Sequence, residues 1–191
     1  MIQEIIVTTQ NEDGTTHIAP MGIREENGLV QVAPFKPSAT LENIQRNKSA
    51  VVNRIDDVRI FAGCLTGRKD WPLVPTEKIN GQRLEAALSH LELELESFED
   101  DELRPRFYLK PVLEKTHSAF KGFNRAQSAV LEAAILVSRL DMLSEEKINQ
   151  ELKYLTIAID KTAGLNENLA WKWLMEKIEA FRQEKKESET A

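Results

Sequence analysis

Small polar side chains stand where the predicted strands of this chain end and where its predicted helices begin. These residues are Thr8, Thr9, Ser38, Thr40, Asn53, Asn124 and Arg125. Ser38 and Thr40 come at the start of a predicted helix, where free backbone N–H groups and the helix dipole favour an anion. Arg125 opens a later, apolar helix and could place a fixed positive charge near a phosphate. Residues of these types suit the binding of a small anionic ligand.

The segment Ala19, Pro20, Met21 and Gly22 is a second candidate, because it follows a predicted strand and contains small residues. Small residues allow the backbone to approach a flat ligand closely. The alternative is that all of these residues are ordinary caps and turns. From their spacing alone, that alternative is the simpler interpretation.

Standard catalytic motifs are absent from the sequence. The segment 63–69 resembles a phosphate-binding loop, but its glycine spacing is wrong. His17, His90 and His117 fall on separate predicted strands, where they either converge as metal ligands or, as we expect, lie at turns or on the surface of the sheet. Cys64 is expected to be a packed thiol, since only Arg68 and Lys69 nearby in sequence would lower its pKa.

Residues 90–96 carry leucine and glutamate in strict alternation, which predicts a half-buried strand. Its acidic residues are Glu92, Glu94 and Glu96. They are either cation ligands or the solvent-facing side of the sheet. Because each alternates with a leucine, we expect the solvent-facing arrangement.

The period of the hydrophobic residues changes near residue 120. Before it, the pattern predicts strands over 3–9, 15–23, 29–34, 50–53, 58–62, 90–96 and 104–118, tight turns at 11–14 and 25–28, and a helix over 38–47. After it, helices are predicted over 126–140, from 144 to 163 and from about 166 onward. We therefore expect an α+β fold, with an antiparallel β-barrel over 1–122 and a region of about three helices over 123–191 packed on it.

The overall composition argues against several classes of binding partner for this protein. The 191 residues include 25 basic and 31 acidic side chains, a net charge of −6, and no clustered basic run of the kind that nucleic-acid binding needs. The apolar run Ala133–Val137 is far shorter than the roughly 20 residues that cross a bilayer. The N-terminal residues lack a signal-peptide pattern, and the single cysteine allows neither an internal disulfide nor a cysteine cluster. We expect a cytoplasmic protein without a nucleic-acid, membrane or metal partner.

Several short motifs occur in a characteristic order along nearly the whole chain. They are Glu4–Thr9, His17–Gly22, Phe35–Asn43, Val51–Asp57, Phe120–Ala126 and Val130–Ala134. In this order they resemble the domain of unknown function 447 family, an uncharacterised family of FMN-binding split-barrel proteins. The resemblance implies an antiparallel split barrel, FMN as the cofactor, and a homodimer with FMN at or near the subunit interface.

The resemblance also implies positions for the cofactor. The residues on the phosphate side would be Ser38, Thr40 and Arg125, with Asn124 in the same motif as Arg125. The residues beside the isoalloxazine ring would be Thr8, Thr9, Ala19, Pro20, Met21 and Gly22, with Asn53 as a hydrogen-bonding partner.

The function that the resemblance implies is that of a flavin-dependent oxidoreductase on an unidentified small substrate. Similar sequences occur in organisms with methanopterin-linked one-carbon metabolism, which is a hint about that substrate. Because the cofactor carries the redox chemistry in flavin proteins, the absence of a nucleophile or metal cluster is expected. Two alternatives remain: a non-catalytic flavin carrier or sensor, and an interaction module whose C-terminal helices dock a partner, which exposed Trp171 and Phe181 would favour.

Overall fold

The computed structural model describes residues 1–190, with the side chains of residues 1–188. The chain divides into two compact units. The barrel unit comprises Met1–Asp56 and Asp70–Phe120, and the helical unit comprises Asp57–Lys69 and the residues from Lys121 onward. The helical unit therefore includes a segment, 57–69, that the sequence analysis assigns to the barrel.

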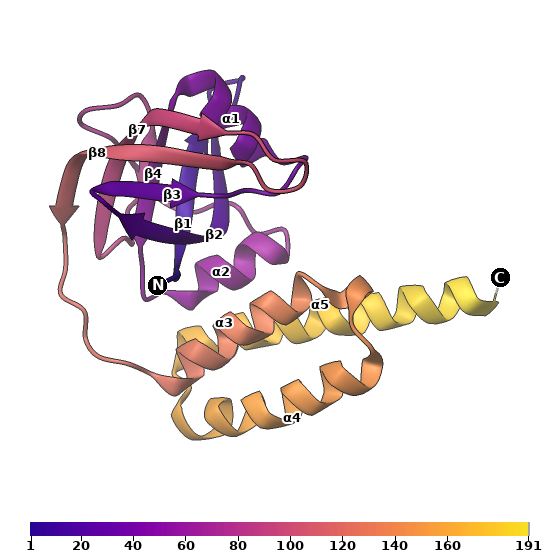
Figure 1. Ribbon diagram of the computed structural model, residues 1–191. Coiled ribbons are helices and arrows are strands. Elements are labelled where there is room, and N and C mark those ends of the chain that lie inside the picture. The colour runs from indigo at the N-terminus through magenta and orange to yellow at the C-terminus, as the bar shows by residue number, and fades with distance from the viewer. Residues whose placement is uncertain (191) are drawn as a thin grey trace. The chain divides into compact units, whose positions relative to one another are not determined.

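The barrel unit is built on antiparallel strands. Within the described residues, the barrel strands are β1 (Gln3–Gln10), β2 (Thr16–Glu26), β3 (Leu29–Val32), β4 (Ser49–Arg54), β7 (Ser89–Glu99) and β8 (Arg106–Thr116). They close into a barrel in the order β1-β2-β3-β8-β7-β4, with every neighbouring pair antiparallel (Figure 1). β5 (Leu73–Pro75) and β6 (Gln82–Leu84) form a separate two-stranded sheet. The predicted antiparallel β-barrel is confirmed.

The turn between β2 and β3 shows how local sequence sets the strand pairing. Asn27 and Gly28 both have positive φ, 53° and 77°, which asparagine and glycine tolerate better than other residues. The turn places Glu26 opposite Leu29, and the pairing continues to Ile23 opposite Val32. Both members of that last pair are fully buried in the barrel core.

Helix α1 (Ala39–Asn47) covers one end of the barrel (Figure 1). Its residues Leu41 and Ile44 join the same buried cluster as Val52 and Phe107 of the strands. Since burying an aliphatic side chain contributes about 1.5–3 kcal/mol, these two residues fix α1 firmly against the strands.

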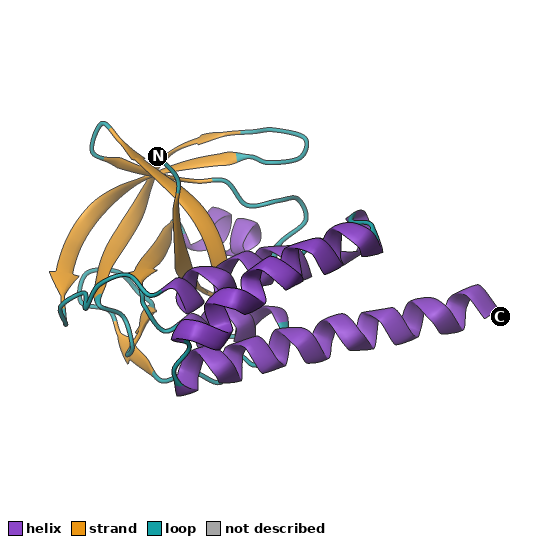
Figure 2. Cartoon of the chain, turned by 90° about the horizontal axis from the view of Figure 1, so that it is seen from below, coloured by secondary structure: helices purple, strands orange, loops and turns teal. Residues whose placement is uncertain are grey.

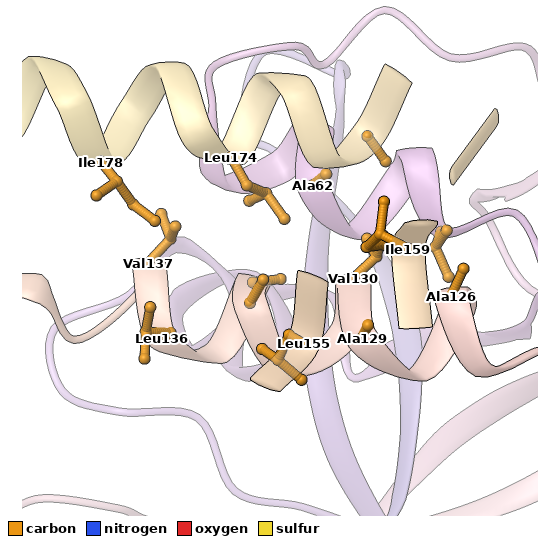
Figure 3. Packing of buried hydrophobic residues seen from close by; sticks show 14 of the residues in the cluster. Ala62, Ala126, Ala129, Val130, Leu136, Val137, Leu155, Ile159, Leu174 and Ile178 are labelled. Carbon is orange, nitrogen blue, oxygen red and sulfur yellow. The ribbon is translucent and has the colours of Figure 1, made fainter. Parts of the chain in front are cut away.

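The helical unit contains α2 (Val58–Leu65), α3 (Arg125–Val137), the 3₁₀ turn η1 (Leu140–Met142), α4 (Glu145–Thr162) and α5 (Leu165–Thr190). Helices α3, α4 and α5 run side by side, and α5 continues beyond the other two (Figure 2). Their core is a single apolar cluster in which alanines of α3 allow close helix packing (Figure 3). The apolar segment predicted over 126–140 is confirmed as a central helix. Among residues 1–190, no helix combines the length and hydropathy that a bilayer crossing requires.

The prediction of a strand over 58–62 is wrong, because these residues begin α2. The carboxylate of Asp57 caps this helix by accepting the backbone N–H of Arg59, at 3.1 Å. Val58, Ile60 and Phe61 are all buried. In so short a segment the alternation of the β-branched residues Val58 and Ile60 resembles a strand, and five residues are too few to separate the strand period from the helical one.

The expectation that Glu92 faces solvent is also wrong, since its side chain in β7 is 0% exposed. One carboxylate oxygen accepts the backbone N–H of Glu77 at 2.7 Å, and the other accepts those of Lys78 and Ile79 at 2.6 and 3.1 Å. His90 Nε2 lies 3.3 Å from the first oxygen. Glu92 therefore anchors the loop between β5 and β6.

These contacts decide the charge state of Glu92. Burial raises the pKa of its carboxyl, but the three backbone donors and His90 outweigh burial and hold the pKa below the ordinary 4.5. A carboxyl whose pKa is lower in the folded than in the unfolded protein stabilises the fold above its unfolded pKa. That stabilisation is lost as the pH falls through the folded pKa.

We predict that Glu92→Gln lowers the free energy of unfolding at pH 7 by about 3 kcal/mol, because charge-assisted hydrogen bonds are lost in a buried place. The difference from the wild-type protein should narrow as the pH falls below 4.5 and through the lowered pKa of Glu92, where Glu92 itself becomes protonated. Urea denaturation over a pH series that starts at pH 7 measures it. Glu94→Gln, on the same strand and exposed, is the control. An equal loss in both variants would contradict the anchoring role.

Candidate functional site

The first turn of α1 presents unpaired backbone donors. Ser38 is the N-cap: its side-chain oxygen accepts the N–H of Leu41 at 3.3 Å, and its carbonyl accepts the N–H of Glu42 at 3.2 Å. The N–H groups of Ala39 and Thr40 lie in the first turn, where a helix offers no internal acceptor. This arrangement, with the positive end of the helix dipole, suits a phosphate. The helix predicted over 38–47 and its Ser38 cap are confirmed.

Thr40 supplies an independent indication of a ligand at this turn. Its side chain is 1% exposed, and its Oγ1 has no hydrogen-bond partner among the described residues. A buried hydroxyl without a partner costs about 1–3 kcal/mol. An oxygen of a bound phosphate would accept this hydrogen bond, so the residues of this turn fit the phosphate of FMN.

Thr9 positions α1 through Asn43, which the sequence analysis does not identify. Asn43 Nδ2 donates to Thr9 Oγ1 at 3.0 Å and to Asn11 Oδ1 at 2.8 Å, and Asn43 is buried. Its own Oδ1 accepts from Arg46 at 2.6 Å. The signal for this role is present in the sequence as an asparagine between Leu41 and Ile44, on the apolar face of the predicted helix.

Thr8 and Asn53 are brought together, and their hydrogen-bonding groups are engaged inside the protein. Asn53 Nδ2 donates to Thr8 Oγ1 and to the carbonyl of Ile6, both at 3.2 Å. Asn53 Oδ1 accepts the N–H of Leu84 at 2.7 Å, and Thr8 donates to the carbonyl of Gln82 at 2.6 Å. These bonds join β1, β4 and β6, so they hold the β5–β6 sheet in place.

The segment 19–22 lies on an open strand edge. Residues 19–22 of β2 pair with β1, whereas the pairing of β2 with β3 begins at Ile23. Among the described strands, none pairs with the other edge of this segment. A Cβ added at Gly22 would lie 2.9 Å from Cγ2 of Ile2, so a larger residue would displace the Ile2 side chain. Because successive residues of a strand direct their backbone groups to opposite edges, only alternate residues of this segment, Gly22 among them, present backbone groups at the open edge to a flat ligand.

Asn124 and Arg125 belong to the helical unit, whereas the other candidate residues belong to the barrel unit. Asn124 is the N-cap of α3: its Oδ1 accepts the N–H of Ala126 at 2.7 Å, and its Nδ2 donates to the carbonyl of Thr162 at 3.0 Å. Arg125 is exposed and forms no ion pair within residues 1–188. The site that the barrel unit supplies by itself consists of the first turn of α1 and the open edge of β2.

The remaining sequence candidates have other roles. Burial raises the pKa of the Cys64 thiol to about 11, which opposes its use as a nucleophile. Gly63 is buried inside α2, so the segment 63–69 does not form a phosphate-binding loop. His90, expected at a turn or on the surface, is buried, and its Nδ1 lies 2.9 Å from Nε2 of His117.

Two further alternatives from the sequence concern a metal site and two aromatic side chains of the helical unit. Among the described residues, no group of three or more His, Cys, Asp or Glu side chains is arranged to hold a metal ion. Trp171 and Phe181 are half-buried and pack against the apolar cluster of the helical unit. They stabilise that unit and do not form an exposed aromatic surface.

Solved structures share this fold. An FMN-bound protein of the DUF447 family from Methanosarcina mazei superimposes with a TM-score of 0.79 at 24% identity, over 92% of this chain and 94% of that one. The 2-nitrobenzoate 2-nitroreductase of Pseudomonas fluorescens gives a TM-score of 0.52 at 23% identity, over 60% and 64% of the two chains. The styrene monooxygenase flavin reductase of Pseudomonas putida S12 gives 0.51 at 16%, over 61% and 82%. The fold is therefore the flavin-reductase type of split barrel.

Family comparison covers both parts of the sequence. The family described as protein of unknown function (DUF447), N-terminal domain, matches residues 3–118. The companion family, described as protein of unknown function (DUF447), matches residues 124–176. A search of curated proteins gives no match. Because the two matches span most of the sequence, the chain belongs to the DUF447 family.

Proposed function

We propose that this protein binds FMN, with the phosphate at the first turn of α1. The observation that carries the proposal is the buried Oγ1 of Thr40, which has no hydrogen-bond partner among the described residues. Ser38 and the first backbone N–H groups of α1 supply further donors around it. The FMN bound to the Methanosarcina mazei protein supports the choice of ligand.

The open edge of β2 is the proposed place for the isoalloxazine ring. Along residues 19–22, the backbone groups of alternate residues face away from β1, and no described strand pairs with that edge. The ring of a flavin is flat and carries donors and acceptors along one side, which suits such an edge. The hydrogen bond between Asn43 and Thr9 holds α1 against β1. The first turn of α1 and the open edge of β2 therefore stay in a fixed position relative to each other.

We propose that the function is that of an oxidoreductase with a small-molecule substrate. Bound FMN would supply the redox chemistry, and the protein would orient the ring and control access to it. The names of two structural neighbours, a nitroreductase and a flavin reductase, support this reaction class. A homodimeric state and a link to one-carbon metabolism are parts of the proposal that rest on the family resemblance, and action in the cytoplasm rests on the composition of the sequence.

Turnover separates the enzyme from a flavin carrier or sensor. We predict that FMN-loaded protein oxidises NADH or NADPH catalytically when an electron acceptor is present, faster than the same concentration of free FMN. Nucleotide oxidation followed by absorbance measures the rate. A single stoichiometric reduction without turnover would favour the carrier or sensor.

The phosphate contacts can be tested by substitution. We predict that Ser38→Ala combined with Thr40→Ala weakens FMN binding roughly 10- to 100-fold, because charge-assisted hydrogen bonds to the phosphate are lost. Quenching of flavin fluorescence measures the affinity, and circular dichroism checks the fold. The matched control is Ser97→Ala with Thr116→Ala, two exposed residues of β7 and β8. Unchanged affinity in the first variant would remove both hydroxyls from the phosphate site.

Thr40→Val gives a test in the absence of ligand. We predict that this change leaves the free energy of unfolding of FMN-free protein unchanged or raises it by about 1 kcal/mol, because an unpaired buried hydroxyl is removed. Thr9→Val should instead lower it by about 1–3 kcal/mol, because Asn43 then loses an acceptor. Urea denaturation measures both. If Thr40→Val destabilised the protein as much as Thr9→Val, the Thr40 hydroxyl would have a structural role instead.

A further inference from the structure

A hollow of about 370 Å³ lies on the barrel unit, lined by residues of β2, β3 and β8. Its lining includes Gly22 and Arg24 of β2, Gln31 of β3, Arg106 of β8, and Asp101 and Arg104 from the segment before β8. We call it the arginine pocket. Apart from Gly22, these residues take no part in the site described above.

The strand register places the arginine pocket on the outer wall of the barrel. Arg24 lies directly opposite Gln31. Arg106 precedes Phe107, which pairs with Val32. Because Phe107 and Val32 are fully buried and side chains alternate along a strand, Arg24, Gln31 and Arg106 all face outward. Three neighbouring strands thus direct polar side chains to one patch.

The charge in the pocket is unbalanced, with three arginines against the single carboxylate of Asp101 in its lining. Asp101 Oδ1 is already engaged, since it accepts the backbone N–H groups of Leu103 and Arg104 at 2.9 and 2.7 Å. Outside the lining, Glu99 lies 3.3 Å from Arg106. Like charges held close together repel one another, so this cluster favours a bound anion. That is notable in a chain whose net charge is −6.

The arginines differ in how many of their guanidinium N–H groups already donate hydrogen bonds within the protein. Arg104 Nη2 donates to the carbonyl of Ala33 at 3.2 Å, and its guanidinium lies 4.5 Å from the ring centre of Phe35. These contacts orient the Arg104 guanidinium. The side chain of Arg24 forms no hydrogen bond or ion pair within the described part of the chain. Its donors are therefore free for the bidentate contacts that guanidinium groups make with carboxylates and phosphates.

We propose that the arginine pocket binds the anionic group, a phosphate or a carboxylate, of the small molecule that reacts with the flavin. The link to the flavin rests on the proposed function, whereas the anion site itself rests on the arginines. Gly22 connects the two, because it belongs both to the open edge of β2 and to the lining of the pocket. The substrate class is accordingly an anionic molecule, and neutral compounds should be poor substrates.

The experiment follows the arginine Nε–Hε resonances of ¹⁵N-labelled protein during titration at constant ionic strength. Inorganic pyrophosphate and benzoate are the two probes, used separately, with and without saturating FMN. We expect a saturable shift of the Arg24 resonance with at least one probe. Arg24→Gln should weaken that binding roughly 10-fold, as judged from the remaining arginine resonances. Arg139→Gln, an exposed arginine of the helical unit, should leave it unchanged.

The outcomes are distinct. Saturation by pyrophosphate alone identifies a phosphate-bearing reactant, and saturation by benzoate alone identifies a carboxylate. The absence of saturation with both probes, or equal effects of the two substitutions, would overturn the anion site. Displacement of FMN by the probe would also overturn it, because the pocket would then hold the cofactor phosphate. Failure of FMN to bind, seen in flavin absorbance, would contradict the proposed function and leave the FMN-free titration as the test of the pocket.

Discussion

The buried hydrogen bonds between Asn43 of α1 and the β1 region are the contacts on which the candidate site depends. Leu41 and Ile44 supply apolar burial but little directional preference, whereas the amide of Asn43 contacts Thr9 and Asn11 at defined distances. A buried amide that loses its partners costs more than the same bonds contribute when formed. This asymmetry keeps α1 in one orientation, and with it the first turn that we propose as the phosphate site.

Other buried polar groups of the barrel unit show by contrast why Thr40 is informative. Glu92 accepts three backbone N–H groups, and Asn53 joins β1, β4 and β6. Each is satisfied by the protein and holds the short β5–β6 sheet and its loop. Thr40 lies equally deep, yet its hydroxyl has no partner among the described residues. The barrel unit therefore satisfies the buried polar groups that support it, whereas the Thr40 hydroxyl stays unpaired, which is why we propose it as a contact of the phosphate.

Local sequence patterns predicted the barrel strands and α1 well. The alternation of apolar and polar residues, the Asn27-Gly28 turn and the Ser38 cap each depend only on residues that are close together in the sequence. They failed where a segment is too short to show its period or where distant contacts decide the outcome. Val58 to Ala62 is too short to separate the two periods. Glu92 is buried because a loop about 14 residues away in sequence supplies its donors. The candidate site likewise contains residues that local sequence predicts and residues whose role depends on distant contacts. Ser38 and Thr40 were predicted from a helix start, while the role of Asn43 depends on β1, more than thirty residues away.

The acidity of the chain and its proposed ligands are compatible, because charge acts locally over about one Debye length. A helix start and a cluster of arginines create positive regions on a protein of net charge −6. The central claim is that the first turn of α1 binds the phosphate of FMN, and the most direct measurement compares the affinities for FMN and riboflavin, which lacks the phosphate. We predict that FMN binds roughly 100-fold more tightly than riboflavin, because several charge-assisted hydrogen bonds to the phosphate are absent with riboflavin. Equal affinities for the two flavins would contradict it.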